Sequence, residues 1–267
     1  MPSIRSTLSR FPRLSRFAKS VYSIWRGEPP ITFSEVTQEL IQACVSKPNP
    51  ILLEIGCNNG GHTLWFSDMF ETASIYCFEP DPRAIARFKR RVGTNSQVKL
   101  FEIALSDHRG EITFYQSDGH HNEKQAKDMP EGYDKSGSIK KPKESLKVHP
   151  WLTFENTIKV KTTTLDDWCE DHQIDTIDFI WMDVQGAEMD VFKGGERFLP
   201  NVRFIYTEYS NREMYEGQAS LNQILRYLKD FKVLVRYPSD VLLYNTRFDF
   251  HPDNLQKEGL LRSSRHQ

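Results

Sequence analysis

One short stretch of the sequence is typical of a turn that holds a nucleotide-like cofactor. Residues 53–60 read LEIGCNNG, so an apolar segment runs into a turn that carries Glu54, Gly56 and Gly60. In the dinucleotide-binding pattern GxGxxG, the second glycine lets the backbone approach a pyrophosphate. That position is Asn58 here, and a carboxylate at Glu54 would repel a pyrophosphate. The spacing ExGxxxG therefore favours a cofactor that carries an ammonium, such as S-adenosylmethionine, over NAD.

A second acidic residue follows where such a cofactor would present its ribose. Glu79 lies in the stretch CFEPDP, residues 77–82, at the end of the next predicted strand. A carboxylate there can accept hydrogen bonds from both ribose hydroxyls, and a charged bond contributes roughly 1.5–3 kcal/mol. Dinucleotide-binding folds also place an acid at this point, so only the glycine spacing separates the two cofactors. An alternative in which the glycines only form a tight turn and bind no cofactor stays open.

Apolar segments alternate with helical patterns along most of the chain. Strand, helix and strand follow one another at a pitch that predicts βαβ units and an α/β fold with a parallel sheet. The expected strands cover residues 51–55, 74–78, 98–103, 177–182, 202–207, 231–235 and 241–244. The expected helices between them cover residues 61–70, 82–92, 188–193 and 221–228. The expected organisation is an arm at 1–34, one domain at 35–250 with an insert at 117–157, and a polar tail at 251–267.

The bulk composition excludes several classes of protein. The chain has 267 residues, a net charge of -1 and four cysteines without a CxxC pair. This charge gives no reason to expect a nucleic-acid partner. The cysteine pattern argues against a disulfide framework or a zinc site and favours a reducing compartment, so we expect a cytoplasmic protein. No apolar run reaches the ~18–20 residues that a membrane span requires.

The N-terminal residues 1–27 contain six basic residues and no acidic residue, with apolar residues at helical spacing. One interpretation is a basic amphipathic segment in peripheral contact with an anionic membrane surface. A second is an arm that docks on its own domain or on a partner subunit, and a third is a transit peptide. Pro12 would break or kink a continuous helix, so we favour the docked arm.

Several motifs in order resemble the FkbM-type family of S-adenosylmethionine-dependent methyltransferases. They are LEIGCNNG (53–60), CFEPDP (77–82), EIALSDHRGEITFY (102–115), TTTLDDW (162–168), IDFIWMDVQGAEMDVFKGG (177–195) and VRFIYTEYS (202–210). The resemblance implies a Rossmann-like class I methyltransferase fold. Its sheet would have seven mostly parallel strands, helices on both faces and an antiparallel last strand. It also implies O-methylation, mostly of hydroxyls on sugars in glycans, glycolipids or natural products.

The resemblance also assigns roles to individual residues. Those expected at the cofactor are Glu54, Gly56, Cys57, Asn58, Gly60, Glu79, Pro80, Ile103, Ala104, Asp183 and Gln185. A sugar hydroxyl is a weak nucleophile, so a base should accept its proton. Asp183 and Glu208 end adjacent predicted strands, and we expect Asp183 as the base and Glu208 as the second candidate. His62, His120 and His121 are further candidates.

A divalent metal is a less favoured alternative to a base. Asp183 and Glu208 would offer Mg²⁺ two oxygen ligands, but the sequence shows no third ligand, so we expect no metal site. We expect the insert to form a lid over a small-molecule or glycan acceptor. Its seven lysines would hold a phosphate, and Trp151 and Phe154 would stack on a sugar, unless the segment is only a solvated loop.

Two other functions compete with the sugar methyltransferase. A methyltransferase for nucleic-acid amino groups would need an (N/D)PP(Y/F) turn, and the corresponding segment reads DVQG, residues 183–186. A non-catalytic carbohydrate-binding descendant of the fold, or an enzyme for a non-sugar acceptor, stays open. The sequence carries no signal of oligomeric state.

Overall fold

The computed structural model of the protein describes residues 30–129 and 132–261. The predictions made for residues 1–27 lie outside this range. None of the helices in the described part is long and apolar enough to cross a membrane. The end of the expected arm joins the domain, because Ile31 forms a bridge with Arg236 at the edge of the main sheet.

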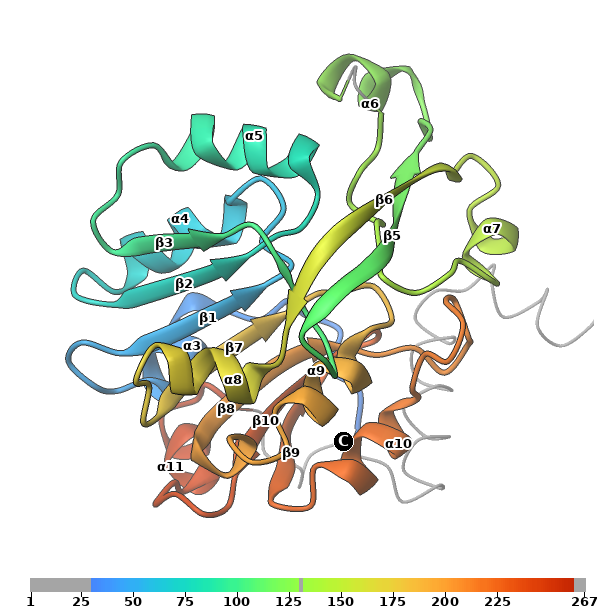
Figure 1. The fold of residues 1–267 in the computed structure, drawn as a ribbon. Coiled ribbons are helices and arrows are strands. Elements are labelled where there is room, and N and C mark those ends of the chain that lie inside the picture. Colours follow the sequence, from blue (N-terminus) through green and yellow to red (C-terminus); the bar gives the residue numbers. More distant parts are fainter. Residues whose placement is uncertain (1–29, 130–131, 262–267) are drawn as a thin grey trace, which may run out of the picture.

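Seven strands form the main sheet in the order β3-β2-β1-β7-β8-β10-β9 (Figure 1). The strands are β1 Ile51–Ile55, β2 Ser74–Phe78, β3 Val98–Phe101, β7 Ile177–Met182, β8 Val202–Glu208, β9 Phe231–Arg236 and β10 Asp240–Asn245. The pairs from β3 to β8 are parallel, and β10 runs antiparallel to both β8 and β9. The predicted fold class is therefore confirmed. The strand order reverses between β1 and β7, and ligands of open α/β sheets bind at the carboxyl ends of strands near such a point.

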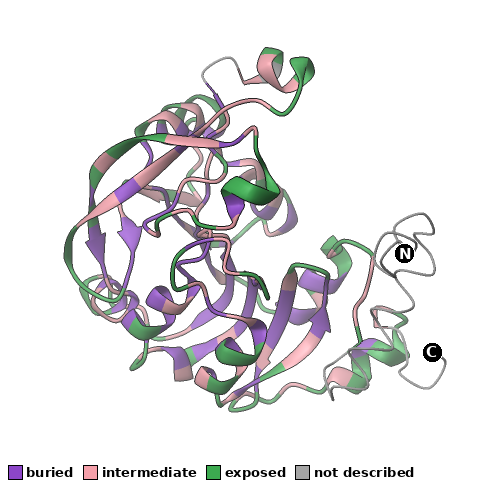
Figure 2. Ribbon diagram, turned by 90° about the vertical axis from the view of Figure 1, so that its right-hand side faces the viewer, coloured by how far each residue is buried: buried purple, intermediate pink, exposed green. Residues whose placement is uncertain are grey.

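Helices cover both faces of the sheet. Successive residues of a strand point to opposite faces, and the strands contribute apolar residues to both. Leu52 contributes to a core under one set of helices, α3 Gln38–Cys44, α4 Gly61–Met69, α5 Pro82–Val92 and α11 Pro252–Lys257. Leu53 and Ile55 contribute to a core under the other set, α8 Leu165–Asp171, α9 Glu188–Gly194 and α10 Leu221–Tyr227, with the short 3-10 helix Leu199–Asn201. Figure 2 shows the strands of the main sheet as mostly buried.

A second sheet of three strands stands beside the main one, in the order β4-β6-β5. Its strands are β4 Ala104–Leu105, β5 Gly110–Asp118 and β6 Thr153–Thr163. Strands β5 and β6 form a long antiparallel pair that projects past the main sheet (Figure 1). Both ends of the expected insert at 117–157 therefore belong to these strands. The connection between them carries α6 Glu123–Asp128 and α7 Ser145–Val148 and folds back, with Ser138 bridging to Tyr115.

The C-terminal segment expected as a loose polar tail is helical in its described part. Pro252 begins α11, where its fixed φ suits the first turn of a helix. Leu255 in this helix is buried in the core on the α4 face. One apolar residue on a short polar helix was too weak a pattern to indicate this packing from the sequence.

Candidate active site

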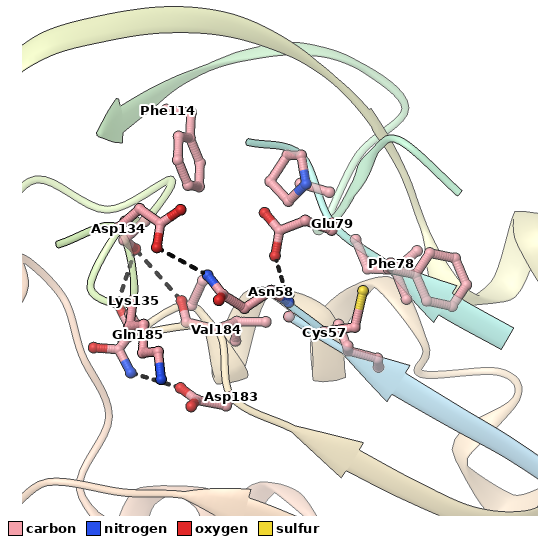
Figure 3. Close-up of a pocket in the computed structure, with 18 of the residues that line it drawn as sticks. Cys57, Asn58, Phe78, Glu79, Phe114, Asp134, Lys135, Asp183, Val184 and Gln185 are labelled. Carbon is pink, nitrogen blue, oxygen red and sulfur yellow. Dashed lines mark hydrogen bonds between the residues drawn. The ribbon is translucent and has the colours of Figure 1, made fainter. Parts of the chain in front are cut away.

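A cavity of about 300 Å³ lies at the carboxyl ends of β1, β2 and β7 (Figure 3). Turns after these strands supply Gly56, Cys57, Asn58, Glu79, Pro80, Asp183 and Gln185, and the segment around β4 supplies Ile103 and Ala104. Nine of the eleven predicted cofactor residues therefore line one cavity. The other two, Glu54 and Gly60, do not line it.

The glycines of the first turn are required by close packing. Gly56 has a φ of +87°, and a Cβ on it would lie 1.9 Å from the carbonyl oxygen of Asp183. Gly60 has a φ of +75° and precedes α4, and a Cβ there would lie 2.5 Å from Val92 in α5. Gly56 thus lets the β1 turn touch the β7 turn, and Gly60 lets α4 begin against α5.

Glu79 faces the cavity with both carboxylate oxygens held by backbone donors. The Asn58 N–H donates to Oε2 at 2.9 Å, and the Asp81 N–H donates to Oε1 at 2.8 Å. Burial, opposed by these two hydrogen bonds, raises the pKa of Glu79 to about 8. The carboxyl group is therefore fixed in position, and donors from a ligand would favour its charged form.

Glu54 lies behind the turn instead of in the cavity. Its side chain is only 1% exposed and accepts a hydrogen bond from the Thr63 hydroxyl in α4. Burial raises the pKa of Glu54 to about 8. Alternation along β1 explains this placement, since Glu54 points to the same face of the sheet as Leu52. The structure thus gives Glu54 a position that ties α4 to β1, with no direct contact to the cavity.

Asn58 offers an unused hydrogen-bond acceptor at the cavity. Its Nδ2 donates to Asp134 at 3.4 Å, while its Oδ1 is buried and has no hydrogen-bond partner among the described residues. A buried polar atom without a partner costs roughly 1–3 kcal/mol, so it commonly marks a place where a ligand donates. Asn58 also has a φ of +44°, which asparagine tolerates better than most residues.

Asp183 and Glu208 lie close together, but only Asp183 lines the cavity. The Gln185 side-chain amide bridges them, at 2.5 Å to Asp183 Oδ1 and 3.0 Å to Glu208 Oε2. Burial raises the pKa of Asp183, while nearby Lys135 lowers it. Burial and the charge of Asp183 raise the pKa of Glu208 well above its usual range. Asp183 is the carboxyl group of this pair that faces the cavity, so it is the one placed to accept a proton from a ligand.

A segment of the insert covers the cavity, and sequence analysis assigned a role only to its Lys135, as one of the seven lysines expected to hold a phosphate. Asp134, Lys135, Ser138 and Ile139 all line the cavity. Asp134 is buried and pairs with Arg87 of α5. The Ser138 hydroxyl donates to the Gln185 carbonyl at 2.8 Å. These contacts join the insert to α5 and to the turn after β7.

Apart from Lys135, the insert residues that were expected to bind an acceptor do not line the cavity. The lysines Lys140, Lys141 and Lys143 form ion pairs with Asp190, Glu216 and Glu213. Trp151 contacts Tyr133 and the candidate base His121, with ring centroids 5.1 and 5.5 Å apart. His120 bonds the Met129 carbonyl. His62, in contrast, does line the cavity.

The described residues contain no group of three or more His, Cys, Asp or Glu side chains arranged to hold a metal ion. The carboxyl groups of the cavity instead have donors from the chain itself. This donor set suits an organic ligand with hydroxyl, amino and carboxylate groups.

Comparison with known proteins agrees with this geometry. The sequence profile of the methyltransferase FkbM domain matches residues 54–233, which include the turns after β1, β2 and β7. The chain belongs to the FkbM methyltransferase family. It is 41% identical to the 2-O-methyltransferase NoeI of Sinorhizobium fredii strain NGR234 over 239 residues, which cover 88% of this chain and 93% of that protein.

A more distant relative and a solved structure are also similar to this FkbM methyltransferase. The hexuronic acid methyltransferase AglP of Haloferax volcanii is 24% identical over 194 residues, 71% of this chain and 67% of AglP. Among solved structures, a methyltransferase from Geobacter sulfurreducens aligns over 91% of this chain and 95% of its own, at 14% identity and a TM-score of 0.41.

Proposed function

We propose that this methyltransferase binds S-adenosylmethionine in the cavity and methylates a hydroxyl of a sugar. The observation that carries the proposal is Glu79, which faces the cavity from the end of β2 and is fixed by two backbone N–H groups. Support for a sugar comes from the relatives, because one is named a 2-O-methyltransferase and another a hexuronic acid methyltransferase.

The chain offers a complementary group to each part of the cofactor. Glu79 would accept the ribose hydroxyls, and the apolar wall of Ile103, Ala104 and Phe114 would flank the adenine. Asn58 Oδ1 would accept from the ammonium, and Lys135 would pair with the carboxylate. Glu54 and Gly60 would act indirectly, by holding the turn in shape. When bound, the cofactor supplies a methyl group that its sulfonium already activates.

Asp183 is the residue we assign as the base. It would take the proton that the acceptor hydroxyl loses while the acceptor oxygen forms its new bond to carbon. Its raised pKa brings it closer to neutrality, which suits a general base at physiological pH. Alignment of the reacting atoms would supply much of the remaining rate enhancement, ~7–11 kcal/mol in well-oriented reactions.

Incubation with labelled S-adenosylmethionine and a panel of oligosaccharides tests the proposal. Mass spectrometry should show a sugar that gains one CH₂ unit, and fragmentation should place the methyl on oxygen. Cofactor binding without methylation of any glycan would instead favour a carbohydrate-binding descendant, and methylation of other hydroxyls only would favour a non-sugar acceptor.

A chelator distinguishes a mechanism in which Asp183 is the base from one in which a metal ion activates the hydroxyl. The Gln185 amide already occupies one oxygen of each carboxyl group, and Glu208 does not line the cavity, so the Asp183–Glu208 pair is poorly suited to Mg²⁺. We therefore expect turnover to persist in EDTA. Loss of turnover that Mg²⁺ restores would support the metal.

A further inference from the structure

We infer that a second, aromatic pocket binds the sugar ring of the acceptor, and that this ring is uncharged. The inference rests on the proposed function, because it names the class of sugar that the same enzyme would accept. The aromatic pocket has a volume of about 750 Å³. Its lining includes Glu35, His62, Trp65, Trp181, Tyr206 and Asp240.

The aromatic pocket adjoins the cofactor cavity through one residue. His62, at the start of α4, lines both of them. Along β7, Trp181 lines the aromatic pocket, while Asp183, two residues further on, lines the cofactor cavity. A ring in the aromatic pocket would therefore present its hydroxyls toward His62 and Asp183, which is where methyl transfer requires the acceptor.

The walls of the aromatic pocket suit a sugar ring. Trp65 and Trp181 meet edge to face with centroids 6.0 Å apart, and Trp181 stacks on Tyr206 at 4.1 Å. Trp65 is half-buried, so part of its ring is accessible from the pocket. Aromatic faces pack well against the apolar C–H face of a pyranose, and a few polar groups at the rim give orientation.

The charges at the aromatic pocket exclude an anionic ring. Its two ionisable carboxyl groups are Glu35, which is exposed, and Asp240, which is largely buried. None of its lining residues, all within the described part of the chain, is lysine or arginine. Burial raises the pKa of Asp240 to about 6, so at pH 7.5 it is mostly ionised. Both carboxylates would accept hydrogen bonds from sugar hydroxyls but repel a uronate or a phosphate.

Pairs of methyl glycosides that differ only at C6 provide the test. We would use the methyl glycosides of glucose, galactose and mannose and the matching methyl uronides. Saturation-transfer NMR on the full chain loaded with S-adenosylhomocysteine measures binding, and methyl transfer from S-adenosylmethionine measures turnover. For at least one pair, the neutral glycoside should bind and react at least tenfold better than its uronide.

Two substitutions connect that preference to the aromatic pocket. Trp65→Ala should raise KM for the neutral glycoside about tenfold, because it removes the accessible stacking face. Glu35→Gln, on an exposed residue where folding is not at risk, should narrow the preference for the neutral glycoside several-fold by reducing repulsion of the uronide. Trp151→Ala is the matched control, because that half-buried tryptophan lines neither pocket.

Each outcome bears on one claim. Three results would overturn the inference. The protein could bind S-adenosylhomocysteine but none of the glycosides, or it could bind the uronides as well as or better than the neutral glycosides. The third is an effect of Trp151→Ala without an effect of Trp65→Ala. Failure of S-adenosylhomocysteine itself to bind the wild type would overturn the proposed function instead. Calorimetry with S-adenosylhomocysteine on both tryptophan variants confirms that each remains folded.

Discussion

The cofactor cavity and the aromatic pocket lie side by side but are built differently. Backbone turns after three strands form the cofactor cavity, with Gly56 and Asn58 in left-handed conformations. Side chains that project from the strands themselves, such as Trp181 and Tyr206, form the aromatic pocket. The cofactor cavity therefore presents fixed backbone groups and carboxyl groups whose pKa is raised. The aromatic pocket presents flat apolar faces with acidic side chains at its rim. This contrast suits a cavity that activates a group and a pocket that positions its acceptor.

The largest difference in kinetic effect is expected between two variants, one with a carboxylate replaced in the cofactor cavity and one with a carboxylate replaced in the aromatic pocket. Asp183→Asn removes the proposed base in the cofactor cavity and should lower kcat by ~10²–10⁴, with little change in the KM of the glycoside. Asp240→Asn in the aromatic pocket should mainly raise that KM. Steady-state kinetics on both variants make the measurement.

Glu208→Gln is the matched control for Asp183→Asn. Glu208 does not line the cavity, so Glu208→Gln should lower kcat by less than about tenfold. A greater loss in Glu208→Gln than in Asp183→Asn would transfer the role of base to Glu208.

Glycine substitutions should show that the cofactor cavity depends on its turns. Gly56→Ala strains a left-handed residue and places a Cβ against the Asp183 carbonyl, so unfolding free energy should fall by about 2–4 kcal/mol. Gly217 has a similar φ of +74°, but a Cβ on it would meet no other atom within 4 Å, so Gly217→Ala should cost only about 1 kcal/mol. Urea unfolding measures both, and equal losses would contradict the packing argument.

A separate effect is expected on the pH dependence of stability. The pKa of Glu54 is raised to about 8 in the fold, so the folded protein keeps a proton that the unfolded chain loses near its ordinary value. The resulting stabilisation is fully present below about pH 4.5 and is lost as the pH rises through about 8. Glu54→Gln should therefore flatten the fall in Tm between pH 5 and 8. Parallel Tm curves for the two proteins would show that Glu54 does not titrate this way.

The fold and the cofactor cavity could be predicted because their signals are local. Glu54, Gly56 and Asn58 fall in one turn, and Glu79 and Asp183 each end an apolar strand. The antiparallel last strand came from the family resemblance. The position of Glu54 behind the turn could not be predicted as easily, because strand alternation competed with the expectation of an ammonium contact.

The aromatic pocket and the cover of the cofactor cavity could not be predicted for a different reason. Residues such as Phe33, Trp65 and Asp240 come from distant segments, and in sequence each aromatic residue is indistinguishable from a core residue. Asp134 and Lys135 lie in a polar stretch that resembles a solvated loop. Tertiary contacts, such as the pairing of Asp134 with Arg87 and the hydrogen bond from Ser138 to the Gln185 carbonyl, hold that stretch over the cavity.

Calorimetry on the cofactor cavity tests the central claim most directly. We would titrate wild type, Glu79→Ala and the exposed control Glu102→Ala with S-adenosylmethionine and with NAD. The account predicts that wild type and Glu102→Ala bind S-adenosylmethionine and not NAD, and that Glu79→Ala binds about 10–100-fold more weakly through loss of a charged acceptor. Preference for NAD, or unchanged binding by Glu79→Ala, would contradict it.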